Sequence, residues 1–137
     1  MRCDFVPAQG LSLAWPMVKE SIESVLKRCK ESWIAEDVYS RIRVQQAFLY
    51  TFHVEQKYNG CMVVEVNQDP FLPSRALNIW VLASNDFSAI KPNLEDWIIS
   101  IAKEAGCSVV KFVGRKGWTK VLEGLMTATH VVYERKL

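Results

Sequence analysis

The sequence lacks several features that would assign its class at once. No stretch approaches the ~20 apolar residues of a membrane-spanning helix, and Met1–Asp4 is not followed by the apolar run of a signal peptide. The 17 Lys and Arg residues and 15 Asp and Glu residues leave a formal net charge of only +2. A dedicated nucleic-acid binder concentrates many basic residues on one face. We therefore expect a cytoplasmic protein that binds neither membranes nor nucleic acids.

Motifs for metal binding and nucleophilic catalysis are also missing. The four cysteines, Cys3, Cys29, Cys61 and Cys107, show no Cys-x-x-Cys or Cys/His pairing, so we expect no metal site. The sequence has no Walker loop and no Ser/His/Asp order. We interpret the cysteines as free thiols in a reducing compartment.

The residues that are present describe an ordinary globular domain. Half of them are hydrophobic, which excludes disorder, and only six are glycine and five proline, which excludes a low-complexity chain. No repeat or linker divides the sequence. A single domain over residues 1–137 follows, in line with the usual size of ~100–150 residues.

Apolar spacing predicts two helices and an antiparallel hairpin in the first half of the chain. Pro16 suits the first turn of a helix, where its missing N–H has no partner to lose. The pair Asn59-Gly60 can supply the positive φ angles of a hairpin turn. The predicted elements are a helix over about residues 16–30, a shorter helix with Ile34, Val38 and Ile42, and strands at Phe48–Val54 and Met62–Val66.

The second half predicts alternating strands and helices. Ala76–Ala83 is almost continuously apolar, as in a strand buried on both faces. A polar loop, Ser84–Pro92, leads to a helix that Asn93 caps and Gly106 ends. The remaining predicted elements are a strand at Val109–Val113, a short helix at Gly117–Leu125 and a final strand at His130–Leu137.

The order α-α-β-β-β-α-β-α-β predicts an α/β fold with a mixed sheet and a central parallel βαβ unit. Ligands favour the carboxyl ends of parallel strands, and a helix N-terminus offers free N–H groups to an anion. The alternative is an ordinary capped helix between solvated loops. The pattern thus indicates a pocket bounded by Ser84, Asn85, Asp86, Asn93 and Arg115.

This element order resembles the acyl-CoA N-acyltransferase fold of the GNAT superfamily. Four segments are similar to a group of phage and prophage GNAT-like proteins, and the resemblance covers about residues 15–137. These segments are Trp33–Tyr39, Glu104–Val110, Gly114–Leu122 and Val132–Leu137. Because fold does not decide function, the reaction needs its own argument.

The resemblance implies transfer of an acetyl group from acetyl-CoA to an amine. It places the pantetheine arm between the strands Ala76–Ala83 and Ser108–Val113, and the diphosphate on the loop Ser84–Pro92. The implied cofactor contacts are Leu82, Ala83, Ser84, Asn85, Asp86, Lys91, Asn93 and Arg115.

Two departures from the family pattern concern this site. The loop holds no glycine, and it carries Asp86, whose charge repels phosphate. Leu122 stands where many members have a tyrosine that protonates the thiolate. Tyr133 and His53 remain as catalytic candidates, each with an alternative interpretation as a packed aromatic or a half-exposed strand residue.

Two hypotheses follow for function. The first is an acetyl-CoA-dependent N-acetyltransferase of phage or prophage origin that acts on a small-molecule or protein amine in the host cytoplasm. The second is a non-catalytic protein of the same fold that acts in virion assembly or protein binding, with phage virion proteins as partners. An exposed edge strand beside the closing segment would permit a homodimer.

Overall fold

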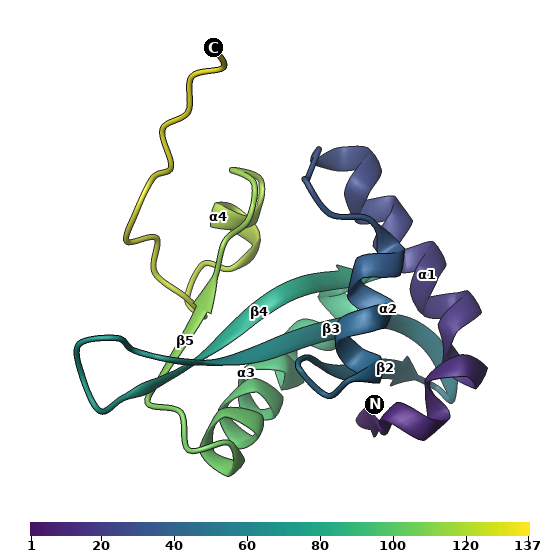
Figure 1. The fold of residues 1–137 in the computed structure, drawn as a ribbon. Helices are drawn as coiled ribbons and strands as arrows, with labels where there is room; N and C mark the ends of the chain where they lie inside the picture. Colours follow the sequence, from purple (N-terminus) through teal and green to yellow (C-terminus); the bar gives the residue numbers. More distant parts are fainter.

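The computed structural model describes residues 1–137, and a five-stranded mixed sheet forms its centre (Figure 1). The strands are β1 (Arg2–Val6), β2 (Phe48–Val54), β3 (Lys57–Gln68), β4 (Arg75–Ser84) and β5 (Val109–Phe112). They are ordered β1-β2-β3-β4-β5. Neighbours are antiparallel except β4 and β5, which are parallel. The predicted mixed sheet is confirmed.

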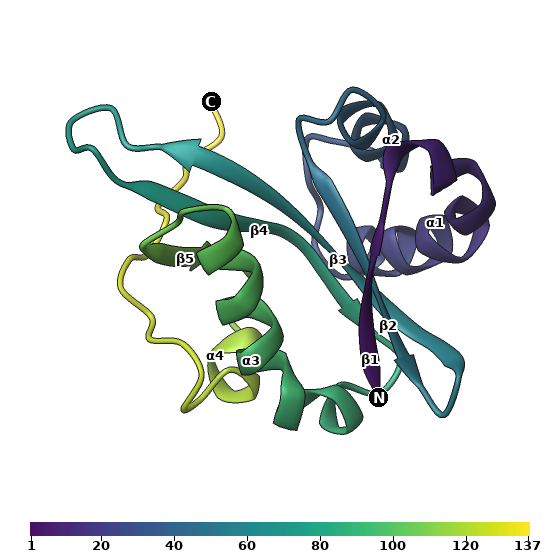
Figure 2. The same ribbon diagram turned by 90° about the horizontal axis from the view of Figure 1, so that it is seen from below.

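Helices cover both faces of this sheet (Figure 2). The helices are α1 (Leu11–Arg28), α2 (Ala35–Arg43), α3 (Phe87–Glu104) and the short α4 (Trp118–Val121), with a 3-10 turn, η1, at Ala8–Gly10. One face carries α1 and α2, and the other carries α3. The crossover from β4 through α3 to β5 is the predicted parallel βαβ unit. None of the helices combines the length and hydrophobicity needed to cross a bilayer.

Each helical layer has its own apolar core. On α3 the buried residues recur every four positions, which places them on one stripe of the helix. They are Ile90, Leu94, Ile98 and Ala102, and they pack on Phe52, Met62, Leu77 and Ile79 of the sheet. The other face buries Leu11, Val18, Ile22, Val38 and Ile42 against Leu49, Val63 and Val81. Burial of each large side chain contributes about 1.5–3 kcal/mol, so these two cores hold the layers in place.

Two helices begin earlier than predicted. The chain is already helical at Leu11 and at Phe87, so Pro16 lies inside α1 rather than at its first turn, and Pro92 lies inside α3 rather than at the end of the preceding loop. A proline inside a helix loses one N–H bond and strains the preceding turn. The fully buried side chains of Leu11 and Ile90 offset that cost because they extend the apolar stripes toward the helix start. The predicted polar loop therefore shrinks to a two-residue connection, Asn85 and Asp86.

The turn between β2 and β3 also differs from the prediction. Val54 pairs with Lys57, so Glu55 and Gln56 form the turn, with φ values of 51° and 65°. The predicted turn pair, Asn59-Gly60, lies inside β3. Gly60 is needed there for another reason, because a Cβ would lie 2.0 Å from the carbonyl oxygen of Ala83 on β4.

Both ends of the chain differ from the prediction: the N-terminal segment forms a strand, and the C-terminal segment does not. β1 was not predicted, yet it pairs with β2 along its whole length. The final strand predicted at His130–Leu137 is absent because this segment has no hydrogen-bonded neighbour, and Figure 1 shows it leading away from the sheet. The predicted helix Gly117–Leu125 is shortened to Trp118–Val121.

The turn at Glu55 and Gln56 yields a stability prediction. A non-glycine residue at positive φ is strained, and glycine is not, so Gln56→Gly is expected to raise the free energy of unfolding by about 1 kcal/mol. Equilibrium urea unfolding measures this change. Lys57→Gly is the control, since it removes a side chain from a paired strand residue and is expected to destabilise. A Gln56→Gly variant no more stable than the parent would contradict the strain argument.

Candidate functional site

The site begins where β4 separates from β5. The parallel pairing covers only Ala76–Ile79 of β4, which face Val109–Phe112 of β5, whereas β4 continues to Ser84. The backbone of Trp80–Ser84 therefore has no β5 partner. The two strands part at the carboxyl end of β4, which is the edge where the sequence predicted a pocket.

A β-bulge explains the separation. Val63 of β3 faces Val81, but the next residue, Val64, faces Ile79, so Trp80 is an extra residue in β4. As a result the adjacent side chains of Trp80 and Val81 both pack toward α1 and α2. A bulge bends a strand and increases its twist. This one lies directly after the last residue of β4 that pairs with β5.

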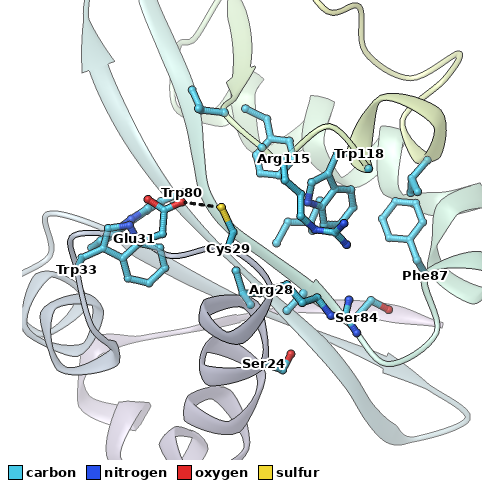
Figure 3. Close-up of a pocket in the computed structure, with 18 residues that line it drawn as sticks. Ser24, Arg28, Cys29, Glu31, Trp33, Trp80, Ser84, Phe87, Arg115 and Trp118 are labelled. Carbon is cyan, nitrogen blue, oxygen red and sulfur yellow. Dashed lines mark hydrogen bonds between the residues drawn. The ribbon is translucent and has the colours of Figure 1, made fainter. Parts of the chain in front are cut away.

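The separation of the two strands leaves a cleft of about 180 Å³ (Figure 3). One wall is the end of α1 and the segment that follows it, and the floor is β4 from Trp80 to Ser84. The other wall is the chain between β5 and α4, together with Phe87 at the start of α3. Because α1 and α3 cover opposite faces, the cleft is lined from both sides of the sheet.

Three half-buried aromatic rings shape the wall on the α3 side. Trp118 meets Phe87 edge-on at 5.5 Å between ring centroids, and it meets Phe112 edge-on at 5.3 Å. Gly114 must be glycine for these rings to pack, since a Cβ there would lie 2.8 Å from ring atoms of both Phe112 and Trp118. Edge-to-face packing stabilises such a cluster. The start of α4 is thereby fixed against the start of α3.

A second aromatic pair lies on the α1 side. Trp33 and the bulge residue Trp80 pack edge-to-face with ring centroids 5.3 Å apart. The Arg41 guanidinium lies 5.7 Å from the Trp80 ring, and its Nη1 donates to Glu65 Oε2 at 2.9 Å. The Trp80 side chain is thus held from two sides.

The charged side chains of the cleft are Arg28, Glu31 and Arg115, and none of them forms an ion pair within the chain. Arg28 ends α1 and extends toward Ser84 in Figure 3. Glu31 lies beside Trp33 and accepts a weak bond from Cys29 Sγ at 3.7 Å. Arg115 folds back over Gly117, where a Cβ would lie 2.5 Å from its Nη1. The cleft therefore carries two free cations and one free anion.

Four of the eight predicted cofactor contacts line this cleft: Leu82, Ala83, Ser84 and Arg115. The other four do not line it. Asn85 and Asp86 form the connection, while Lys91 and Asn93 lie within α3, so the predicted cap at Asn93 is wrong. Asp86 takes the position before the helix and accepts a bond from Ser88 Oγ at 2.6 Å.

The connection from β4 to α3 is held by Asn59 of β3. The hydroxyl of Ser84 donates to Asn59 Oδ1 at 2.5 Å, and the N–H of Asn85 donates to the Asn59 carbonyl at 2.6 Å. The N–H of Asp86 in turn donates to Ser84 Oγ at 3.2 Å. Because Asn59 is buried, these bonds fix the short connection at the mouth of the cleft.

The catalytic candidates lie elsewhere. Tyr133 is 91% exposed on the terminal segment, and His53 sits on β2, where its Nε2 lies 3.0 Å from Thr51 Oγ1 and 3.6 Å from Asp4 Oδ2. Neither residue lines the cleft. Leu122 is buried directly after α4.

Sequence reasoning missed the α1 side of the site. It did not select Arg28, Glu31, Trp33 or Trp80, because nothing local connects the end of a helix with a strand that begins 47 positions after Arg28, at Arg75. The Phe87–Trp118 contact was missed because Phe87 was assigned to a loop. An apolar position at Ile90, one helical repeat before Leu94, was the available signal.

Solved acetyltransferases share this fold at low sequence identity. Ribosomal-protein-alanine N-acetyltransferase from Brucella melitensis biovar Abortus matches with a TM-score of 0.73 and 12% identity over 100% of both chains. An aminoglycoside acetyltransferase from an uncultured soil metagenomic sample, in complex with sisomicin, matches with a TM-score of 0.67 and 14% identity over 98% of this chain and 96% of that one. A tetramutant of the BH1408 protein from Bacillus halodurans has a TM-score of 0.75 and 15% identity over 100% of both chains.

These likenesses confirm the predicted fold class. No protein-family model matches the chain, and no curated protein is a significant match to its sequence. At identities of 12–15% the comparison establishes the fold, and the activity has to be argued from the cleft.

Cysteine reactivity tests the burial of Cys61 in the core against the accessibility of Cys29 at the cleft. Cys29 lines it and is half-buried, whereas Cys61 is fully buried, and burial raises the pKa of the Cys61 thiol to about 12. Since the thiolate is the reactive form, alkylation of Cys61 in the folded protein is expected to be at least ~100-fold slower than that of Cys29. Mass spectrometry after iodoacetamide treatment measures both rates. In urea the difference is expected to vanish, and equal rates in the folded protein would place Cys61 outside the core.

Proposed function

We propose that the protein is an acetyl-CoA-dependent N-acetyltransferase. The observation that supports this most is the separation of β4 from β5 after the bulge at Trp80, which leaves an open cleft at the carboxyl end of β4. The cleft opens beside the start of α3, where a helix offers N–H groups to an anion. The solved acetyltransferases of the same fold support the same interpretation.

The residues of the cleft suit a pantetheine arm. The arm is a narrow chain with amide groups, and the edge of Trp80–Ser84 that β5 leaves without a partner offers N–H and C=O groups to such a chain. Leu82, Phe112 and Val113 supply apolar walls on either side. A ligand of this kind would take the place that β5 leaves beside β4.

The diphosphate end fits less well. The connection before α3 has no glycine, and Asp86 places a carboxylate at the helix start. Of the two cleft arginines, Arg115 lies on the wall beside the start of α3, and its guanidinium has the charge and shape to bind phosphate oxygens. We expect the cofactor to depend on this guanidinium more than on backbone N–H groups.

The reaction needs little from the protein beyond positioning. The bound cofactor supplies a thioester; a free amine attacks its carbonyl carbon, a C–N bond forms, the C–S bond breaks, and one proton passes from nitrogen to sulfur overall. An ammonium group must first lose a proton, and Glu31 is the only carboxylate that lines the cleft.

The direct test is isothermal titration with acetyl-CoA. Val113→Trp fills the opening with a large ring and is expected to weaken binding at least ~10-fold. Val109→Trp, on β5 but outside the cleft, is the control and is expected to bind as the parent does. Absence of heat with the parent protein at millimolar acetyl-CoA would remove the proposal.

Asp86 provides an electrostatic prediction. Asp86 directly precedes α3, so Asp86→Asn is expected to tighten acetyl-CoA binding about fivefold at low salt, because a repulsive charge is removed while the size of the side chain is kept. Added salt is expected to reduce the gain. Asp96→Asn, further along α3, is the control. If Asp86→Asn binds no tighter, the phosphates lie elsewhere.

A second candidate function is a non-catalytic role in phage assembly. Leu122 supplies no proton donor, and the exposed apolar side chains of Val131, Val132 and Tyr133 leave a surface for a protein partner. The free edge of β5 could also pair with another copy. Phage or prophage origin rests on the sequence resemblance. Co-purification with virion proteins would support this role, and acetylation of an amine that Val113→Trp abolishes would exclude it.

A further inference from the structure

We propose that the acceptor amine also carries a carboxylate, which Arg28 binds while Glu31 binds the ammonium group. This inference rests on the proposed function, because it names the acceptor of the same cleft. It concerns the side of the cleft formed by the end of α1, Trp33 and Trp80. The ligand class is a small zwitterion with an apolar group.

Charge balance is the first argument. Arg28 and Arg115 outnumber Glu31, and all three lack ion-pair partners, so the cleft has a net positive charge. Even with Arg115 bound to the cofactor, a polycationic amine would meet the uncompensated guanidinium of Arg28. A ligand with an anionic group would give one of them a partner. The cleft therefore selects against polyamines and favours amines that carry a negative group.

The positions of the two arginines separate their roles. Arg28 ends α1 on one face of the sheet, and Arg115 follows β5 and contacts Gly117 at the start of α4. Figure 3 shows Arg28 directed toward Ser84 and Arg115 beside Trp118 on the opposite wall. Arg115 thus lies with the aromatic cluster of the α3 side, where the cofactor is proposed. Arg28 is left for the second substrate.

Opposite charges at two points match a zwitterion. Glu31 follows Arg28 by three residues, but the helix ends between them and the two side chains form no ion pair. In Figure 3 Glu31 lies next to Trp33 and Trp80, whereas Arg28 reaches along the floor. An ammonium group at Glu31 and a carboxylate at Arg28 would satisfy both, since charge-assisted hydrogen bonds are the strong ones.

The tryptophan pair accounts for the apolar part. Trp33 and Trp80 are both only half-buried and line the cleft with their edge-to-face rings. Trp80 points to this side because of the bulge in β4. A flat apolar group of the acceptor can pack on these rings, as in most small-molecule sites. Tryptophan is therefore a suitable probe of the site.

The experiment compares three indole probes, and spermidine as a fourth, by isothermal titration without acetyl-CoA. Tryptophan is expected to bind at least ~10-fold more tightly than tryptamine, which lacks the carboxylate, and than indole-3-propionate, which lacks the ammonium group. Arg28→Met is expected to abolish the preference over tryptamine, and Glu31→Gln the preference over indole-3-propionate. Arg43→Met, at the end of α2 and outside the cleft, is the matched control. Each variant is checked for an unchanged unfolding midpoint.

The outcomes separate this inference from the proposed function. Binding of tryptophan that depends on Arg28, without any binding of acetyl-CoA, would support the zwitterion site and remove the transferase. Binding of acetyl-CoA with equal affinity for tryptophan and tryptamine would overturn the zwitterion site alone. No binding of any probe at millimolar concentration, or tighter binding of spermidine than of tryptophan, would also overturn it.

Discussion

One extra residue in β4 determines the shape of the candidate site. Without the bulge at Trp80, the parallel pairing of β4 with β5 could continue past Ile79 and Phe112 and close the opening. The bulge leaves backbone groups of β4 without a strand partner and turns a tryptophan toward α1 at the same time. Opening the cleft thus costs backbone hydrogen bonds between β4 and β5. Burial of apolar side chains in the two cores on either side of the sheet offsets this cost.

The positive charge of this cleft comes from side chains. In a site built on a glycine-rich loop, backbone N–H groups supply it instead. A loop with glycines lets several N–H groups approach an anion. Here Asn59 fixes a two-residue connection, and Asp86 occupies the helix start, so positive charge has to come from Arg28 and Arg115. A guanidinium binds an anion strongly, but the binding then depends on a single side chain. Ligand preference in this protein therefore depends on single arginines.

The sequence predicted three of the five strands closely but misplaced the starts of both long helices, for physical reasons. β2 was predicted with its observed bounds, and β4 and β5 within one residue at each end, because alternating or continuous apolar runs are local signals. Pro16 misplaced the start of α1, since a proline marks a first turn only when tertiary packing does not extend the helix beyond it. The cap expected at Asn93 misplaced the start of α3 for the same reason, because Ile90 extends the buried stripe toward Phe87. The final strand failed because a strand also needs a neighbour that no local pattern supplies.

Only the part of the candidate site at the end of β4 and in the segments that follow it could be predicted from the sequence. Leu82, Ala83 and Ser84 follow from the rule that ligands gather at strand ends. The opposite wall depends on the crossing of α1 over the sheet, which places Arg28 beside a strand far along the chain. Gly114 shows the same limit, because its missing Cβ matters only once Phe112 and Trp118 are packed around it. The shape of a cleft between two layers depends on how the layers pack. The residues that give this cleft its specificity therefore include those of α1, which the pattern of the strands does not reveal.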